Sequence, residues 1–327
     1  MKELRIVSGM RPSGRLHIGH LSVLSNWLRL QEENDCFFFV ADWHALTTAF
    51  DDPGSIGENT REMLADWLAV GIDPERSTVF VQSRLLEHAE LHLLLSMITP
   101  LSWLERVPTY KDQVQQLAAR GKDITTYGFL GYPLLQTADI LMYRADAVPV
   151  GQDQLPHLEL SREVARRFNH LYGNVFPEPQ ALLAKESLLP GVDGRKMSKS
   201  YENEISLSAS PDIIEKRVRM MITDPARIRK NDPGHPEVCH VYTYQELYNR
   251  DLSTEIAASC RAGSVGCVTC KLRLAESLNK YLKPIRERRE RLLAQPGLID
   301  EVIERGTEKA RAAAGETMRL VRRAMRI

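Results

Sequence analysis

Two histidines near the start of the chain have the spacing of an anion-binding turn. His17 and His20 stand three residues apart, between an apolar segment over 4–7 and a predicted helix over 20–33. A strand, a turn and a helix start leave backbone N–H groups free to bind phosphate. Imidazoles add donors, while Gly14 and Gly19 leave room for a nucleotide. Taken alone, this N-terminal turn (residues 11–20) is more often a pair of solvent-facing histidines.

A basic loop (residues 194–200) lies far downstream, after Pro190 and Gly191. It contains Lys196, Met197, Ser198, Lys199 and Ser200. By itself it could be a solvated loop. In this order, however, the two stretches resemble the two signatures of class I aminoacyl-tRNA synthetases. The resemblance covers essentially the whole chain, and the amino acid must be identified from other residues.

Alternating apolar and amphipathic segments must position these residues. Strands are expected over 4–7, 37–41, 78–82 and 147–150, separated by helices over 20–33, 56–70, 85–98, 131–143 and 155–168. This order predicts an α/β fold with a doubly wound, parallel, Rossmann-type sheet. Residues 100–128 are expected to be irregular: either an insertion that covers substrate or contacts another subunit, or a surface loop.

The second part of the chain changes character beyond residue 204. Long amphipathic segments over 211–222, 253–262, 267–293 and 298–325 predict an all-helical domain. We therefore expect a catalytic domain over 1–203 and a helical domain over 204–327. The pattern leaves open whether the last helix packs back on the first domain.

The helix predicted over 131–143 is mostly apolar but carries a polar stripe. Tyr132, Gln136 and Asp139 fall on one face. A buried carboxylate is costly without a partner, so Asp139 either awaits a ligand donor or has an internal cap or ion pair.

A second strand–turn–helix unit ends in Gly151, Gln152, Asp153 and Gln154. Asp153 could accept the ribose hydroxyls of a nucleotide, or it could simply cap the helix that follows.

Four of the five cysteines cluster late in the chain. Cys239, Cys260, Cys267 and Cys270 follow the pattern C-x20-C-x6-C-x2-C, whereas Cys36 lies in an apolar run and is expected to be a core thiol. Four thiolates suit tetrahedral zinc or a [4Fe–4S] cluster, and spacing alone favours zinc. Four unrelated cysteines are the alternative.

A closer resemblance is to the tryptophanyl-tRNA synthetases. It rests on a Pro-Ser-Gly turn at 12–14, an Asp-x-His-Ala segment at 42–45, the Tyr-Pro-x-Leu helix from Tyr132, and the Gly-x-Asp-Gln turn at 151–154. A bacterial subset of that family holds a [4Fe–4S] cluster on four cysteines of this arrangement, which moves the expectation from zinc to iron–sulfur. Many bacterial members have Gln in place of Arg11 and Asn in place of His20.

The resemblance implies roles for particular residues. His17, His20, Lys196 and Lys199 would be catalytic. Asp139 would accept the indole N–H, Tyr132 and Gln154 would bind the ammonium end, and Gln136 and His44 would complete the pocket. ATP, with Mg2+, would be bound by Arg11, Pro12, Ser13, Gly19, His20, Gly151, Gln152, Asp153, Lys196, Met197, Ser198, Lys199 and Ser200.

Composition limits the partners. The formal net charge is zero, but residues 271–327 contain 15 Lys and Arg against 8 Asp and Glu. That bias suits an RNA-facing surface or an ordinary solvated helix face.

The resemblance implies tRNA(Trp), L-tryptophan and ATP as partners, and a homodimer. We expect no membrane or DNA partner and a cytoplasmic location, because no apolar leader or spanning segment is present. A tyrosyl enzyme and an RNA-binding paralogue are the alternatives.

Overall fold

Five parallel strands form one sheet in the computed structural model. The model describes residues 3–119, 121, 123–183 and 189–327, without the side chains of Thr109, Gln116 and Ser200. The strand order is β3-β2-β1-β4-β5. The strands are β1 (Arg5–Met10), β2 (Asp35–Val40), β3 (Ser77–Val81), β4 (Ala147–Val150) and β5 (Gln180–Leu183). Four of them were predicted. The sequence pattern missed β5, a short strand with no fully buried residue.

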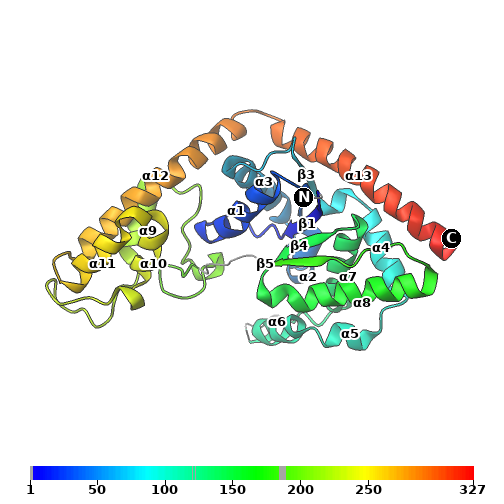
Figure 1. Ribbon diagram of the computed structural model, residues 1–327, viewed down its shortest axis with the longest axis horizontal. Helices are drawn as coiled ribbons and strands as arrows, with labels where there is room; N and C mark the ends of the chain where they lie inside the picture. The colour runs from blue at the N-terminus through cyan, green and yellow to red at the C-terminus, as the bar shows by residue number, and fades with distance from the viewer. Residues whose placement is uncertain (1–2, 120, 122, 184–188) are drawn as a thin grey trace.

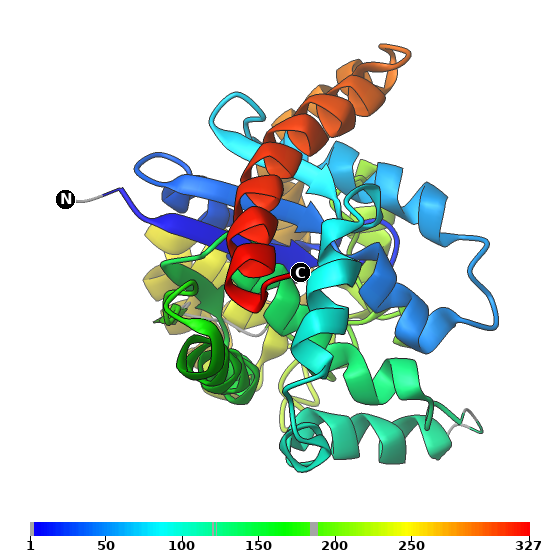
Figure 2. The same ribbon diagram turned by 90° about the vertical axis from the view of Figure 1, so that its right-hand side faces the viewer.

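Helices cover both faces of the sheet, as the doubly wound prediction requires (Figures 1 and 2). In the first part of the chain they are α1 (Leu21–Leu30), α2 (Asp42–Ala49), α3 (Ile56–Val70), α4 (Glu87–Ser96), α5 (Leu101–Glu105), α6 (Pro108–Ala118), α7 (Tyr127–Met142) and α8 (Leu155–Tyr172). In the second part they are α9 (Pro211–Met220), α10 (His240–Tyr248), α11 (Ser253–Arg261), α12 (Cys267–Leu293) and α13 (Leu298–Met325).

Strand β2 shows how the two faces are separated. Phe38 packs with α1, α3 and α12, whereas Phe37 and Phe39 pack with α4, α7, α8 and α13. Side chains alternate across a strand, and a strand buried on both faces is therefore a continuous apolar run. Trp27 of α1 stacks on Phe38 with ring centroids 4.3 Å apart. Cys36 is fully buried, as expected of a core thiol, and burial raises its pKa to about 12.

The expectation that residues 100–128 are irregular was wrong. Helices α5 and α6 occupy much of this range, and α7 already begins at Tyr127. Pro108 stands in the first turn of α6, where its missing N–H costs nothing and its fixed φ favours the helix. The proline therefore marks the start of a helix and does not exclude one.

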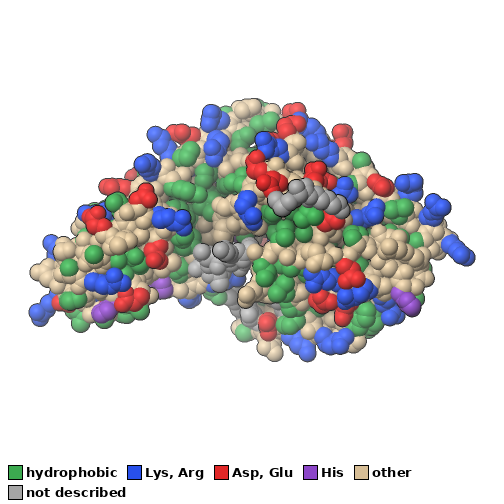
Figure 3. All heavy atoms as spheres, in the orientation of Figure 1, with side chains coloured by type: hydrophobic (Ala, Val, Ile, Leu, Met, Phe, Trp, Pro, Cys, Tyr) green, Lys and Arg blue, Asp and Glu red, His purple; other side chains and the backbone are tan. Residues whose placement is uncertain are grey.

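The last helix returns to the sheet. Figure 1 shows α9, α10 and α11 beside the start of α12, and α13 running back past the strands. Helix α13 packs on β3 and α4. A Cβ on Gly306 would stand 1.8 Å from the carbonyl oxygen of Val79, so only glycine allows this approach. Figure 3 shows acidic and basic side chains interspersed over α12 and α13.

Candidate active site

The N-terminal turn places two histidine rings against each other at the carboxyl end of β1. Their centroids are 3.8 Å apart, and the backbone N–H of His17 donates to Nδ1 of His20 at 3.2 Å. Burial lowers the pKa of His17 to about 3 and that of His20 to about 4, with Lys199 contributing to both shifts. Both imidazoles are therefore neutral at pH 7, and each can offer an N–H as a donor.

The surroundings of the turn fit a polar ligand. Nδ1 of His17 is buried and has no hydrogen-bond partner in the part of the chain that the structure describes. Gly14 has a φ of +101°, which favours glycine. A Cβ on Gly19 would stand 2.9 Å from the His17 ring, so a larger residue would displace that imidazole.

The basic loop brings one of its two lysines to this turn. Lys199, in the one-turn helix η4 (Lys199–Tyr201), donates from Nζ to the carbonyl oxygen of Ser13 at 2.9 Å. Lys196 is exposed and points to no contact of this kind among the described residues. Met197 is buried, and the side chain of Ser200 lies outside the described residues.

Asn203 fixes the shape of the basic loop, a role that sequence reasoning missed. Its side chain accepts from the backbone N–H of Ser198 at 2.8 Å and donates to the carbonyl oxygen of Lys196 at 3.1 Å and to Asp193 at 2.7 Å. The loop thus has an internal anchor, although nothing in an isolated Asn signals it.

A cavity of about 310 Å³ opens beside the turn. It lies at the carboxyl ends of β1 and β4, the neighbouring strands between which the strand order of the sheet reverses. All five residues predicted to surround the amino acid line it: His44, Tyr132, Gln136, Asp139 and Gln154. Arg11 lines it too and donates to the hydroxyl of Thr48.

Asp139 is heavily hydrogen-bonded within the cavity wall. Its carboxylate, 1% exposed, accepts from Nε2 of His44 at 2.8 Å, from Nδ1 of His88 at 2.6 Å, and from the amide of Gln82 at 2.7 and 2.9 Å. Burial raises the pKa of Asp139, but the two imidazole donors more than offset that effect and hold it below its usual value.

The internal-pair alternative is therefore correct for Asp139, although the residue also faces the cavity. Sequence reasoning missed Gln82 and His88, because they lie in other elements, directly after β3 and in α4, and no local pattern relates them to Asp139. Nε2 of His88 bonds in turn to the hydroxyl of Tyr143 at 2.7 Å. An indole N–H that reaches Asp139 must share or replace one of these donors, since a carboxylate has about four acceptor positions.

Asp153 does not cap the following helix. It lies exposed in the one-turn helix η3 (Gln152–Gln154), and α8 begins after Gln154 without a side-chain cap. The capping alternative is wrong, and the carboxylate is accessible beside the cavity residue Gln154.

The four late cysteines lie in one region at the ends of α10, α11 and α12. Burial is the main cause that raises the pKa of the Cys270 thiol, and the thiols of Cys239, Cys260 and Cys267 raise it further. The amide of Gln245 lies 3.4 Å from the sulfur of Cys270, and Arg227 lies 3.7 Å from that of Cys260. Over the described ranges, no group of three or more His, Cys, Asp or Glu could hold a metal ion.

Comparison with known proteins decides the family. The family model described as tRNA synthetases class I (W and Y) matches residues 1–283. The chain is 53% identical to a tryptophan–tRNA ligase of Thermotoga maritima, over 99% of both chains. The chain belongs to the tryptophan–tRNA ligase family. An Aquifex aeolicus member of this family is 46% identical, over 99% of this chain and all of that protein.

A solved member of the family has the same fold. The tryptophanyl-tRNA synthetase of Campylobacter jejuni, crystallised with ADP and tryptophan, matches with a TM-score of 0.90 and 34% identity over 99% of this chain and all of that one. Among the described helices, none is long and apolar enough to cross a membrane.

Proposed function

We propose that this protein activates L-tryptophan with ATP and transfers the tryptophanyl group to tRNA(Trp). The observation that carries the proposal is that three features meet at the carboxyl end of β1, the central strand of the sheet. The neutral histidine pair, Lys199 and the cavity containing Asp139 meet there, in a chain of the tryptophan–tRNA ligase family.

The first step joins the tryptophan carboxylate to the α-phosphorus of ATP. A carboxylate oxygen forms a new bond to the α-phosphorus. At the same time the bond between the α-phosphorus and the oxygen that bridges it to the β-phosphate breaks, and pyrophosphate leaves with that electron pair. The carboxylate is ionised at pH 7, so no general base is needed. Positioning and charge stabilisation are needed instead. His17 and His20 would donate to phosphate oxygens, while Lys196 and Lys199 would neutralise the leaving group.

The nucleotide would lie along the N-terminal turn and the turn at 151–154. Arg11, Pro12, Ser13 and Gly19 would contact it on one side, and Gly151, Gln152 and Asp153 on the other, with Asp153 accepting from the ribose. Met197, Ser198 and Ser200 belong to the loop that would close over it. Mg2+, which ATP carries on its phosphate oxygens, supplies further charge neutralisation.

The cavity would select tryptophan through one buried polar contact. The indole N–H would donate to Asp139 in place of one bond from Gln82, with His44 and Gln136 beside the ring and Tyr132 and Gln154 at the ammonium end. Phenylalanine lacks that donor and would leave a buried acceptor unpaired, which discriminates strongly without a separate editing step.

The ATP–pyrophosphate exchange assay tests this function. We expect exchange that depends on tryptophan and not on tyrosine or phenylalanine. Exchange driven by tyrosine would identify the tyrosyl alternative instead. Binding of tRNA without any exchange would identify an RNA-binding paralogue.

We also propose that Cys239, Cys260, Cys267 and Cys270 hold a [4Fe–4S] cluster in a helical, tRNA anticodon-binding domain over 204–327, distinct from a catalytic domain over 1–203. A thiolate-ligated cluster is larger than one ion and carries negative charge. The cationic and amide groups of Arg227, Lys271 and Gln245 beside these thiols fit that charge.

Metal analysis after anaerobic purification tests the cluster. About four iron atoms per chain are expected for a [4Fe–4S] cluster. Cys270→Ser should lose them, and Cys36→Ala, the matched control in the sheet core, should keep them. Stoichiometric zinc without iron would replace the cluster by the zinc alternative.

Two further features complete the proposal. We propose a homodimer, supported by exposed apolar side chains gathered on α4, α5 and the start of α7: Leu86, Leu93, Met97, Leu101 and Tyr127. We propose a cytoplasmic location, because tRNA charging supplies translation.

A further inference from the structure

A buried ion pair joins the long helix α12 to the catalytic part of the chain. Arg289 of α12 is 7% exposed, and its Nε donates to Asp66 of α3 at 2.7 Å. Its Nη2 donates to Glu62, one turn earlier on α3, also at 2.7 Å. Asp66 is fully buried. A charge buried in this way is strongly destabilising without its partner, so Arg289 and Asp66 depend on each other.

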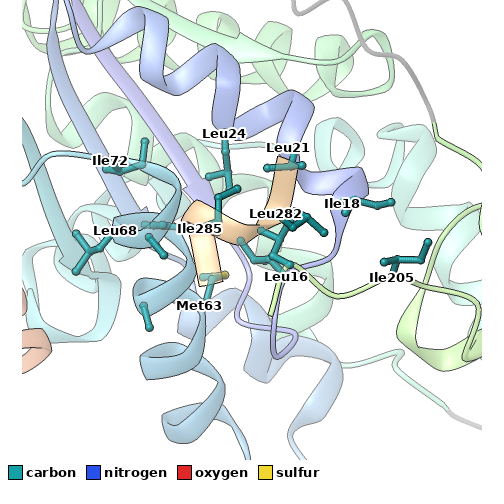
Figure 4. Packing of buried hydrophobic residues seen from close by; sticks show 14 of the residues in the cluster. Leu16, Ile18, Leu21, Leu24, Met63, Leu68, Ile72, Ile205, Leu282 and Ile285 are labelled. Carbon is teal, nitrogen blue, oxygen red and sulfur yellow. The ribbon is translucent and has the colours of Figure 1, made fainter. Parts of the chain in front are cut away.

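Asp66 is shared between α12 and the N-terminal turn. Its second oxygen accepts from the backbone N–H of Leu16 at 2.7 Å, and Leu16 directly precedes His17. Figure 4 shows Leu16 packed near Leu282 and Ile285 of α12. One carboxylate therefore ties the residue before the histidine pair to a helix more than two hundred positions later in the chain.

The same two carboxylates lie within electrostatic reach of Lys199. Burial lowers the pKa of Lys199, while Asp66 and Glu62 act in the opposite direction. Nζ of Lys199 already contacts Ser13 in the N-terminal turn. Two acidic groups thus lie close enough to act on Lys199, beside the region where the proposed triphosphate would lie. Arg289 bonds to both of them, and Arg15 bonds to Glu62 alone.

We propose that Arg289 is a positioning residue for ATP binding, a proposal that rests on the proposed function of the N-terminal turn. It acts through Asp66, which holds the backbone at Leu16, and it neutralises Asp66 and Glu62 so that they do not repel the phosphates. Without Arg289, the acidic pair would weaken ATP binding and leave the amino-acid cavity, which neither carboxylate lines, largely unaffected.

The test measures binding of ATP and of tryptophan separately, by calorimetry on the full-length protein. Arg289→Met should raise the Kd for ATP about tenfold, a typical size for coupling between sites, and leave the Kd for tryptophan within about twofold. Arg289→Lys, which keeps the charge, should retain most of the ATP affinity. The double variant Arg289→Met with Asp66→Asn should recover part of the loss, because the uncompensated charge is gone.

Arg288→Met is the matched control. Arg288 also joins α12 to α3, but it donates to the carbonyl oxygens of Ala69 and Val70, the last two residues of α3, and not to Asp66 or Glu62. It should change neither Kd. If Arg289→Met does not fold, Arg289→Gln retains an amide donor, and the same rise in the Kd for ATP is expected of it.

The outcomes separate this inference from the proposed function. Unchanged ATP binding, or equal weakening of ATP and tryptophan, would overturn the positioning role and leave a purely structural ion pair. Wild-type exchange is measured in parallel. Its absence would contradict the proposed function, while the ATP affinities of the variants would still decide the role of Arg289.

Discussion

At the scale of single residues, the site depends on groups held in one protonation state by their surroundings. The N-terminal histidines are neutral because burial and a nearby lysine disfavour their charged forms. Asp139 is the opposite case, since donors from His44 and His88 keep its buried carboxylate ionised. The first group suits donation to phosphate, and the second suits acceptance from an indole.

Asp139→Asn should raise the KM for tryptophan about 10- to 100-fold, the effect expected when a hydrogen bond to a charged group is lost. The KM for ATP should change little, because the nucleotide is proposed to bind along other turns. Thr137→Val is the control, since Thr137 is buried on the same helix and, among the described residues, bonds to Pro133 and Ser161 and not to Asp139. An unchanged KM for tryptophan in Asp139→Asn would refute the assignment of the pocket.

His157 should make the protein less stable in mild acid. Burial lowers its pKa to about 4, so the unfolded chain binds more protons than the folded one between that value and the ordinary pKa. Stability therefore rises with pH across this window, and His157 should account for about 2 kcal/mol between pH 5 and 7. Urea unfolding at both pH values measures this.

His157→Gln should flatten that pH dependence, and His170→Gln, an exposed histidine of the same helix α8, should not. Identical slopes for all three proteins would contradict the buried, neutral state of His157.

At the scale of elements, two segments far apart in the sequence form the proposed phosphate site. The backbone N–H of Ile18 donates to the carbonyl oxygen of Ile205, and that of Leu207 donates to Leu16. The segment just beyond the basic loop is therefore held to the N-terminal turn by backbone hydrogen bonds. This pairing brings Lys199 to Ser13 and leaves Lys196 exposed, so the two lysines are not equivalent.

Lys199→Ala should lower kcat for adenylate formation about 100-fold, as expected when a contact made mainly in the transition state is removed. The Kd for tryptophan should stay unchanged, because Lys199 does not line the amino-acid cavity. Lys216→Ala, on the exposed face of α9, serves as the control. A variant that weakens only tryptophan binding, with normal kcat, would be inconsistent with this role.

Two glycines of α13 should respond in opposite ways to the same substitution. Gly306→Ala should lower the free energy of unfolding by about 1–3 kcal/mol, because its Cβ would collide with the backbone of β3. Gly315→Ala meets nothing within 4 Å and should raise it by about 0.5–1 kcal/mol, the ordinary gain in helix propensity. Equal effects in urea unfolding would mean that α13 does not pack closely on β3.

At the scale of the whole molecule, α12 and α13 together connect the cysteine region to the far side of the sheet. Helix α12 starts at two of the four cysteines, packs on α9 and α3, and is followed by α13 on β3. Helix α13 also packs on α4 and α7, and the exposed apolar side chains on α4, α5 and the start of α7 are the proposed dimer contact.

A double variant, Leu93→Asp with Met97→Asp, should convert the proposed dimer into monomers, because two charges would have to be buried without partners. Light scattering at micromolar concentration measures the change in mass. Ile228→Asp, at a residue 89% exposed on the helical part, should leave the mass unaltered. A wild-type monomer under these conditions would contradict the dimer.

The sequence by itself determined four of the five strands, many of the helices that alternate with them, the parallel sheet, the N-terminal turn, the basic loop and the polar stripe of α7. These follow from periodicity and from turn chemistry, which act over a few neighbouring residues. Only the tertiary structure decided that Gln82 and His88 saturate Asp139, that Asn203 anchors the basic loop, and that Arg289 bonds to Asp66. The reason is physical: the partner of a buried charge is chosen by which side chains the packed elements bring together, and no local pattern records that choice.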